Sequence, residues 1–547
     1  MRSQTAEKLH QIETGLKKAG LQLPAENVEM KLEDRMAHYK VPSVSIVVID
    51  EQEVKLTKTY GALPETVYQA ASISKAVSAL VALLVAKEKG LDLNEDVNEI
   101  LKNHGSTYRV PKSAFTDTDE KVTLRRLLSH TAGLTVSGFT GYASDTKELP
   151  TTQQILEGEK STSPTNSKPV ESFAVPGTEY RYSGGGTTLV QLILEEVTKE
   201  KFPTLARNYV LDPLEMKSSG YEIHRPGEEN FHPAIGHDRN GNPVKGDWNL
   251  YPESAAAGLW STPADLARFV IEIQKAYKGE SNKIPQDVAQ KMLTKQALGE
   301  YGLGPEVIED TVISFSHGGS NKGFSCFFRG FVNGKGAVVM TNSDRGPNLI
   351  EEIIPSIAAA YDWPAHYINT KIKRPMAIDA TIYEKYANKY QVGGISFEFI
   401  TENNQFFVIV PFPSDKDKPK KFKLTPDSET SFFHISDEVR LEFVFPSGNA
   451  DTFTCSLTPG QRGERITKEL KVSPSIEPEA TQAQLSSTSQ VALVMPIDRK
   501  IASTDQIVSK ISEQSPSSEP PLEAPDKSAV KEAETSTKEA LGVRHDK

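Results

Sequence analysis

Cysteine is scarce in this chain, which has two in 547 residues, Cys326 and Cys455. Two cysteines so far apart in sequence exclude a disulfide framework and a zinc site built on thiolates. Metal-ligand spacings such as His-x-x-x-His are also missing around the histidine considered below, His317. We therefore expect no metal and no other cofactor.

Long apolar runs are missing as well. The opening segment, MRSQTAEKLHQIETGLKKAG, lacks the apolar core that a secretory signal requires. The longest apolar run, from Ala76 to Ala86, is too short to span a bilayer and predicts a buried helix. We therefore expect no membrane span and a cytoplasmic location. A chain renumbered after cleavage, a periplasmic protein or one secreted by a non-Sec route would have the same pattern.

An excess of basic charge is also lacking. Acidic residues number 73 and basic residues 62, for a formal net charge of −11. This balance favours solubility and gives no support to a nucleic-acid partner. The remaining partner that we expect is a small-molecule or short-peptide substrate, and the oligomeric state is left open. A length of 547 residues predicts two or three folded units.

Apolar periodicity predicts an amphipathic helix in residues 1–25, where Leu9, Ile12 and Leu16 recur at helical spacing. Residues 26–370 then mix β-rich and helical patterns. Two pairs of β-rich runs read as hairpins: SVSIVVID with EVKLTKTYG, and FSCFFRGFV with GAVVMTNS. Antiparallel strands with helices between and around them indicate an α+β fold, an α/β sandwich. Further helices are predicted at residues 28–38, from 72 onward, and at 188–198, 264–276 and 350–361.

The character of the sequence changes at residue 378. From 378 to 472, short β-rich runs such as SFEFI, QFFVIVPF and RLEFVF alternate with turn residues, a pattern typical of a small all-β barrel or sandwich. Residues 473–547 contain no aromatics and are rich in Ser, Pro, Glu, Thr and Lys. Such a segment buries too little apolar surface to offset its ordering entropy, so we predict a disordered tail. An alternative role for it is an export signal for a specialised bacterial secretion system.

The strongest local feature is QAASISK, which ends at Lys75 and opens the apolar helix. Ser72 lies three residues before Lys75, so the two share one helix face. A serine at a helix N-terminus has a free backbone N–H that can bind an oxyanion. On an apolar helix, desolvation would lower the pKa of Lys75 and let it accept the serine proton. The alternative is a capping serine with a surface lysine.

The second feature is YRYSGGG, which precedes a predicted helix and contains Tyr182. Three glycines before a helix permit a close backbone approach. A buried tyrosine near a lysine can ionise more readily and shuttle a proton. The alternative is a glycine-rich helix entry with a packing tyrosine.

The third feature is FSHGGS, which brings His317, Gly318 and Gly319 to the end of a predicted strand. A His-Gly-Gly triplet there can present an imidazole and free backbone N–H groups to a ligand. The alternative is a structural histidine.

Taken together, these features resemble the serine β-lactamase and penicillin-binding-protein superfamily: Ser-x-x-Lys, then Tyr-Ser-x before a helix, then His-x-Gly on a strand. The chain is most similar to the class C branch, with its esterases and D-amino-acid-directed peptidases. Four further stretches, VTLRRLLSHTAGL, PGTEYRYSGGG, VLDPLEMKSSGY and AAAGLWSTPADLARF, resemble the same family, and the resemblance covers residues 41–361. It implies a catalytic domain of the β-lactamase/transpeptidase type, with an antiparallel sheet and a helical subdomain. The C-terminal β-rich segment resembles the lipocalin-like appendages of some of these hydrolases.

The resemblance also implies a mechanism. Ser72 attacks a carbonyl and forms an acyl-enzyme, while Lys75 and Tyr182 carry the serine proton to the leaving group. The backbone N–H groups of Ser72 and Ser320 form the oxyanion hole. His317 takes the place of the lysine in the more familiar Lys-Thr-Gly triplet, as a milder electrostatic partner because histidine is mostly neutral near pH 7.

Two departures from the family pattern bear on the substrate. Gly184 stands where β-lactamases of this branch have the Asn of Tyr-x-Asn, and His317 weakens recognition of a carboxylate. Substrate binding then falls to the backbone at Gly184, Gly318 and Gly319, and the loop at 236–254 borders the cleft in this family. We predict an esterase or a D-amino-acid-directed peptidase acting on a small ester, amide or peptide, not an efficient β-lactamase. The alternative is a catalytically inactive penicillin-binding-like protein, serving as a binding or secreted effector module.

Overall fold

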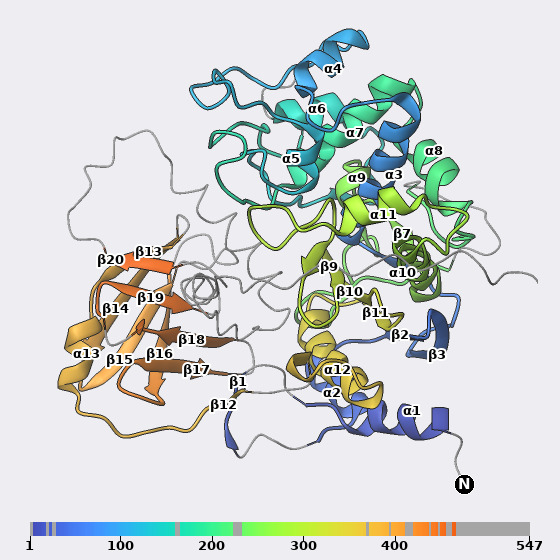
Figure 1. The fold of residues 1–547 in the computed structure, drawn as a ribbon. Coiled ribbons are helices and arrows are strands. Elements are labelled where there is room, and N and C mark those ends of the chain that lie inside the picture. Colours follow the sequence, from blue (N-terminus) through green and yellow to red (C-terminus); the bar gives the residue numbers. More distant parts are fainter. Residues whose placement is uncertain are drawn as a thin grey trace, which may run out of the picture. The chain divides into compact units, whose positions relative to one another are not determined.

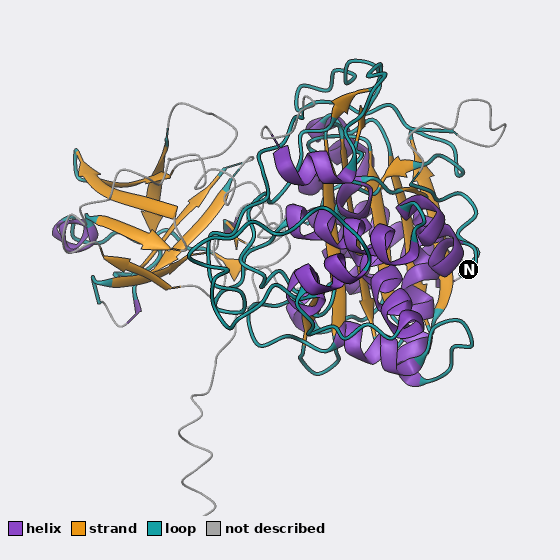
Figure 2. Ribbon diagram, turned by 90° about the horizontal axis from the view of Figure 1, so that it is seen from above, coloured by secondary structure: helices purple, strands orange, loops and turns teal. Residues whose placement is uncertain are grey.

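The computed structural model of the chain describes residues 4–17, 21–24, 29–158, 165–221, 232–367, 371–392, 395–410, 419–436, 439–446, 449–455 and 462–465. Figure 1 labels the helices and strands along the chain, and Figure 2 distinguishes them by colour. The segment at 473–547, predicted to be disordered, lies outside the described residues. The domain boundaries drawn from the sequence stay a prediction.

A six-stranded antiparallel sheet, in the order β3-β2-β11-β10-β9-β8, forms the centre of the N-terminal unit. Both predicted hairpins are confirmed, and the one between β2 and β3 turns at two residues with positive φ, Glu51 and Gln52. Two such residues match the turn that suits the twist of a hairpin. The strands are β2 (Val44–Asp50), β3 (Glu53–Tyr60), β8 (Glu306–Ile308), β9 (Ser314–Asn321), β10 (Phe324–Phe331) and β11 (Gly336–Thr341).

Helices cover both faces of this sheet (Figure 1). Along β2, Val47 and Ile49 join the core beneath α3 and α10, whereas Ile46 and Val48 join the core beneath α2 and α12. Successive strand residues point to opposite faces, so a strand buried on both faces has an unbroken apolar sequence. The helices that contact this sheet or one another are α1 (Gln4–Thr14), α2 (Leu32–Tyr39), α3 (Ile73–Lys89), α10 (Pro263–Lys278), α11 (Gln286–Leu293) and α12 (Gly346–Ala360).

A group of shorter elements packs around α3 to make the helical subdomain. It contains α4 (Val97–Asn103), α5 (Leu124–Leu128), α6 (Thr152–Glu157), α7 (Gly184–Thr198), α8 (Phe202–Ala206), the π-helix η3 (Arg207–Leu211) and α9 (Ser254–Ala257). Two-residue strand pairs are β4 (Tyr68–Gln69) with β7 (Trp260–Ser261), β5 (Tyr142–Ala143) with β6 (Asn249–Leu250), and β1 (Leu21–Gln22) with β12 (Lys371–Ile372). Among the described residues, no helix is long and apolar enough to cross a membrane.

Two expectations about helix limits are wrong. The three glycines from Gly184 to Gly186 do not precede α7 but form its first turn, because Ser183 caps it by accepting the Gly186 N–H at 2.8 Å. The N-terminal helix ends at Thr14, so Leu16 lies beyond it and is buried by a bridge to Met30 instead.

The C-terminal segment forms a closed eight-stranded barrel, β13 to β20, as its alternating pattern predicted (Figure 1). Inward-facing aromatics fill it; Phe399, for example, lies 5.1 Å from Phe443 and 5.4 Å from Tyr390, centroid to centroid. Its strands are β13 (Lys389–Val392), β14 (Ile395–Glu402), β15 (Gln405–Val410), β16 (Lys420–Pro426), β17 (Ser431–Ile435), β18 (Arg440–Val444), β19 (Thr452–Cys455) and β20 (Arg462–Arg465), preceded by η4 (Ala365–Tyr367) and α13 (Thr381–Tyr386). The fold is therefore an α+β catalytic type with an appended barrel.

A buried ion pair fastens α2 to α12. The Arg35 guanidinium donates from Nε and Nη2 to the two oxygens of Glu352, each at 2.8 Å, and the Tyr39 hydroxyl donates to Glu352 at 2.7 Å. Glu352 is 2% exposed. Removing one partner of such a pair leaves an uncompensated buried charge, which is costly.

We predict that Glu352→Ala lowers the free energy of unfolding by about 3–5 kcal/mol. The control, Glu99→Ala, breaks the exposed ion pair with Lys102 and should cost less than about 1 kcal/mol. Urea denaturation followed by tryptophan fluorescence reports the transition of the N-terminal unit, which holds all three tryptophans. Equal costs for the two variants would contradict the prediction.

Candidate active site

Ser72 is held at the turn where α3 begins. The preceding residue, Ala71, has a φ of 48°, a left-handed conformation that non-glycine residues rarely adopt. Ser74 secures this turn: its Oγ donates to the Ala71 carbonyl at 2.5 Å and accepts the Leu259 N–H at 3.0 Å. Ser72 makes no side-chain capping hydrogen bond, so the capping-serine interpretation is wrong and its Oγ faces other groups.

Lys75 is one of those groups. Its Nζ lies 3.1 Å from Ser72 Oγ and donates to the Ala256 carbonyl at 2.8 Å. The residue is 3% exposed, so it is not a surface lysine. Burial lowers the pKa of Lys75 to about 7. A large fraction of this amine is therefore neutral near physiological pH and has a lone pair beside the serine hydroxyl.

Tyr182 lies on the other side of Lys75. Its side chain is hydrogen-bonded to Ser72, and Lys75 Nζ is 5.0 Å from its ring centroid. The expectation that this tyrosine ionises more readily is wrong, because burial raises the pKa of Tyr182 above its usual value. The hydroxyl stays protonated and is suited to donating a proton or passing one on, not to acting as a standing phenolate.

His317 closes the group from β9. It is 4% exposed, and its Nδ1 lies 2.6 Å from the Gly318 carbonyl oxygen. Its Nε2 is buried and has no hydrogen-bond partner among the described residues. Burial, and next the charge of Lys75, lower the pKa of His317 to about 3, so the imidazole is neutral.

The end of β9 passes directly against the nucleophile turn. A Cβ on Gly319 would lie 2.4 Å from the Ala70 carbonyl oxygen and 3.1 Å from the backbone nitrogen of Ser72, so glycine is required there. Cys326 on β10 fastens the same point by donating its thiol to the Ala70 carbonyl at 2.9 Å. Ser320 follows Gly319 on the strand, and its share in an oxyanion hole with Ser72 stays a prediction.

The position of Gly184 has no room for a side chain. A Cβ there would lie 3.0 Å from the Phe139 ring and 3.0 Å from the Ser137 carbonyl oxygen. The Gly184 N–H donates to that same carbonyl at 3.3 Å. The segment containing Ser137 and Phe139 thus fills the space that an asparagine side chain would need, which gives a physical reason for this departure from the family pattern.

His130 is a residue that the sequence reasoning missed. Its Nδ1 accepts the Ser183 N–H at 3.2 Å, and its ring centroid lies 4.4 Å from that of Tyr182 and 5.0 Å from that of Tyr301. Its φ of 59° is left-handed. Burial, then Lys75 and His317, hold the pKa of His130 well below its usual value. Its presence in the SHTAGL stretch was the available signal, but a role requires the contact with Tyr182.

Tyr301 and Tyr180 line the same group of rings and had no sequence signal. Their centroids lie 5.5 Å apart in a stacked arrangement, and their side chains are hydrogen-bonded to each other. Tyr301 lies 6.1 Å from His317, centroid to centroid. Among the described residues, no cluster of three or more His, Cys, Asp or Glu side chains could hold a metal ion.

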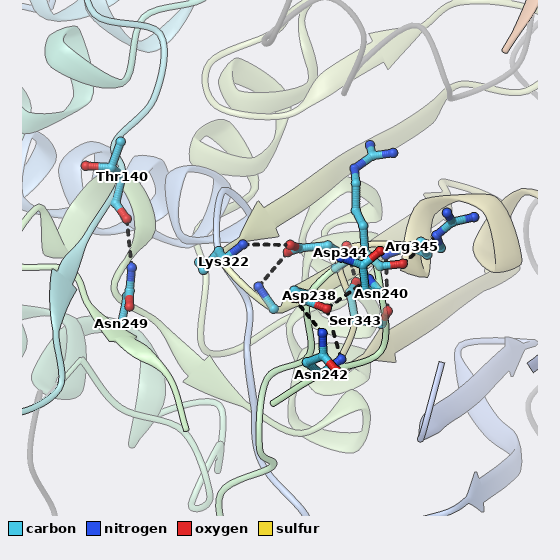
Figure 3. Close-up of polar contacts among 12 residues, drawn as sticks. Thr140, Asp238, Asn240, Asn242, Asn249, Lys322, Ser343, Asp344 and Arg345 are labelled. Atoms are coloured by element: carbon cyan, nitrogen blue, oxygen red, sulfur yellow. Dashed lines mark hydrogen bonds and ion pairs between the residues drawn. The ribbon is translucent and has the colours of Figure 1, made fainter. Parts of the chain in front are cut away.

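The polar loop that was expected to border the cleft is braced against its neighbours (Figure 3). Asn249 donates from Nδ2 to the Thr140 carbonyl at 2.9 Å, and its own carbonyl accepts from Gln69, three residues before Ser72, at 2.8 Å. At the end of β9, Lys322 pairs with Asp344 at 3.2 Å. These bonds tie the loop to the segments on either side of the nucleophile turn.

Curated proteins similar to this chain cover part of its length. Protein flp of Staphylococcus aureus (strain N315) is 26% identical over 350 residues, which are 60% of this chain and 65% of that protein. Protein flp of strain MW2 is 25% identical over the same shares. The chain thus spans about two thirds of the length of the curated relatives it matches, 65%.

Solved structures with the same fold cover more of it. An octameric penicillin-binding protein homologue from Pyrococcus abyssi has a TM-score of 0.51 at 20% identity, covering 79% of this chain and 98% of that one. A crystal structure of SurE with D-Leu has a TM-score of 0.51 at 18% identity, covering 80% and 97%. The model of the Beta-lactamase family matches residues 28–361, more than half of the 547. The chain therefore belongs to the Beta-lactamase family, a family of serine hydrolases.

Proposed function

We propose that this chain is a serine hydrolase that acts through an acyl-enzyme on a small ester, amide or peptide. One observation carries the proposal: a buried lysine with a pKa lowered to about 7 lies 3.1 Å from the hydroxyl of Ser72. A lysine that only stabilised the fold would keep its charge and a carboxylate partner. A neutral amine beside a serine hydroxyl is the arrangement that nucleophilic catalysis needs.

In this mechanism, neutral Lys75 takes the proton of Ser72 as Oγ bonds to the substrate carbonyl carbon. The resulting tetrahedral oxyanion is bound by the backbone N–H groups of Ser72 and Ser320. The Tyr182 hydroxyl protonates the leaving group as the carbon–heteroatom bond breaks, and it recovers a proton from Lys75. Water then repeats the sequence on the acyl-enzyme and releases the acid.

The substrate class follows from what the site lacks. Gly184 offers no side-chain amide, and His317 is neutral, so the groups that hold a β-lactam in this branch are missing. We propose an esterase or a D-amino-acid-directed peptidase. SurE, which has the same fold, was solved with D-Leu. Esters and amides of D-amino acids are therefore the first panel to test. The alternative, an inactive binding module, gives no reason for the contacts between Ser72, Lys75 and Tyr182.

The first prediction concerns the nucleophile. A fluorophosphonate probe should add once to the native chain and not to Ser72→Ala, as measured by intact mass. The control is Ser144→Ala, which removes a serine with the same spacing to a lysine, Lys147, but in a polar loop. Labelling of Ser144→Ala should match the native chain. Persistent labelling of Ser72→Ala, or none of the native chain, would refute the proposed nucleophile.

The second prediction concerns pH. Acylation needs the neutral amine of Lys75, and the protonated form predominates below its pKa of about 7. The rate of probe addition should therefore fall as pH drops, by about tenfold per unit well below the pKa. Lys75→Arg, which stays charged, should react at least about 100-fold more slowly at every pH. A rate independent of pH between about 5 and 8 would contradict Lys75 as the base.

The third prediction concerns β-lactams. Nitrocefin should be hydrolysed at least about 100-fold more slowly than the best ester, since one lost specific contact typically costs 1–3 kcal/mol and two are missing. Gly184→Asn should not restore turnover, because its Cβ would meet Phe139 and Ser137. Nitrocefin turnover equal to ester turnover, or a gain in Gly184→Asn, would overturn this assignment.

A further inference from the structure

We propose that Nε2 of His317 is a hydrogen-bond acceptor for the substrate, so that the site selects substrates with an N–H, ammonium or hydroxyl donor at this point and disfavours a carboxylate. The inference rests on the proposed function and specifies the substrate of the same site. It reverses the charge preference of a site that has a lysine at this position.

The hydrogen bond to Gly318 defines which ring nitrogen carries the proton. Nδ1 of His317 lies 2.6 Å from the Gly318 carbonyl oxygen. A carbonyl oxygen only accepts hydrogen bonds, so Nδ1 must be the donor. A neutral imidazole has a single N–H, which leaves Nε2 with an unprotonated lone pair. The neutral state agrees with the lowered pKa of His317, caused first by burial and then by Lys75.

This lone pair has no partner in the described part of the chain. Nε2 is buried and accepts no hydrogen bond. Buried polar atoms are normally paired in folded proteins, and an exception points to a ligand or to catalysis. The ring lies between those of Tyr182 and Tyr301, each with its centroid 6.1 Å away. The unpaired acceptor thus lies beside the proposed proton carrier.

The donors around it have other partners. Tyr182 is hydrogen-bonded to Ser72, Tyr301 to Tyr180, and Lys75 donates to Ser72 and to a backbone carbonyl. The second neutral imidazole, His130, accepts the Ser183 N–H through Nδ1. That leaves the proton of His130 on Nε2, which is also unpaired and so lies beyond hydrogen-bonding distance of His317.

A carboxylate at this point would meet a lone pair instead of a cation. Two acceptors facing each other repel, and the charge would be buried without a partner. An ammonium, amide N–H or hydroxyl would instead satisfy the orphaned nitrogen. Discrimination by a buried polar group left unpaired is stronger than discrimination by apolar shape.

The specificity test uses the full chain and p-nitroanilides with one D-alanyl core, carrying a free ammonium, an N-acetyl amide or an N-succinyl carboxylate. The ratio of kcat/KM for the ammonium or acetyl compound to that for the succinyl compound should be at least about tenfold. His317→Gln keeps an acceptor and should keep the preference. His317→Leu should lose most of it, and His317→Lys should reverse it. An unchanged ratio in His317→Leu and His317→Lys would overturn the inference while leaving the hydrolase intact.

A second measurement does not depend on turnover. With ¹⁵N-labelled histidine, and His317→Gln to assign the resonance, imidazole ¹⁵N shifts distinguish a protonated from an unprotonated nitrogen. We expect Nδ1 protonated and Nε2 unprotonated at neutral pH, and the Nε2 resonance should shift when D-alaninamide is added to Ser72→Ala but not when succinate is added. A protonated Nε2, or an equal response to succinate, would overturn the inference even if no substrate were hydrolysed.

Discussion

The chemistry of this chain depends on how closely β9 approaches the beginning of α3. Gly319 makes the approach possible, because a Cβ there would lie 2.4 Å from the Ala70 carbonyl oxygen and 3.1 Å from the Ser72 nitrogen. The thiol of Cys326 and the side chain of Asn321, which donates to Gln69 at 2.8 Å, fasten the two segments. A strand edge and a helix N-terminus then face one small volume with free backbone N–H groups.

Burial of that volume accounts for the charge states of the site. Water is largely excluded around Lys75, Tyr182 and His317, and desolvation is the largest cause of each shift. It lowers the pKa of the lysine and the histidine and raises that of the tyrosine, because in every case the charged form is disfavoured. The site is therefore a set of nearly neutral groups that pass a proton, with little fixed charge to attract an anionic substrate.

Local order along the chain made part of this site predictable. Ser72 and Lys75 share a face by helical periodicity alone, and the glycines beside His317 mark a strand that approaches another backbone. The barrel was predictable because alternating aromatics repeat between turn residues. His130 was not assigned a role, since its partner Ser183 lies 53 positions away and only folding brings them together.

The sequence by itself determined the elements, the order of the motifs and the identity of the nucleophile, because these depend on residue type and on neighbours a few positions apart. The tertiary structure alone decided the protonation of the site. Whether Tyr182 ionises readily or His317 carries charge depends on how much water the packed elements exclude, and no spacing encodes that. The direction of the His317 lone pair was likewise decided in three dimensions, by the carbonyl of Gly318 to which its other nitrogen is bound.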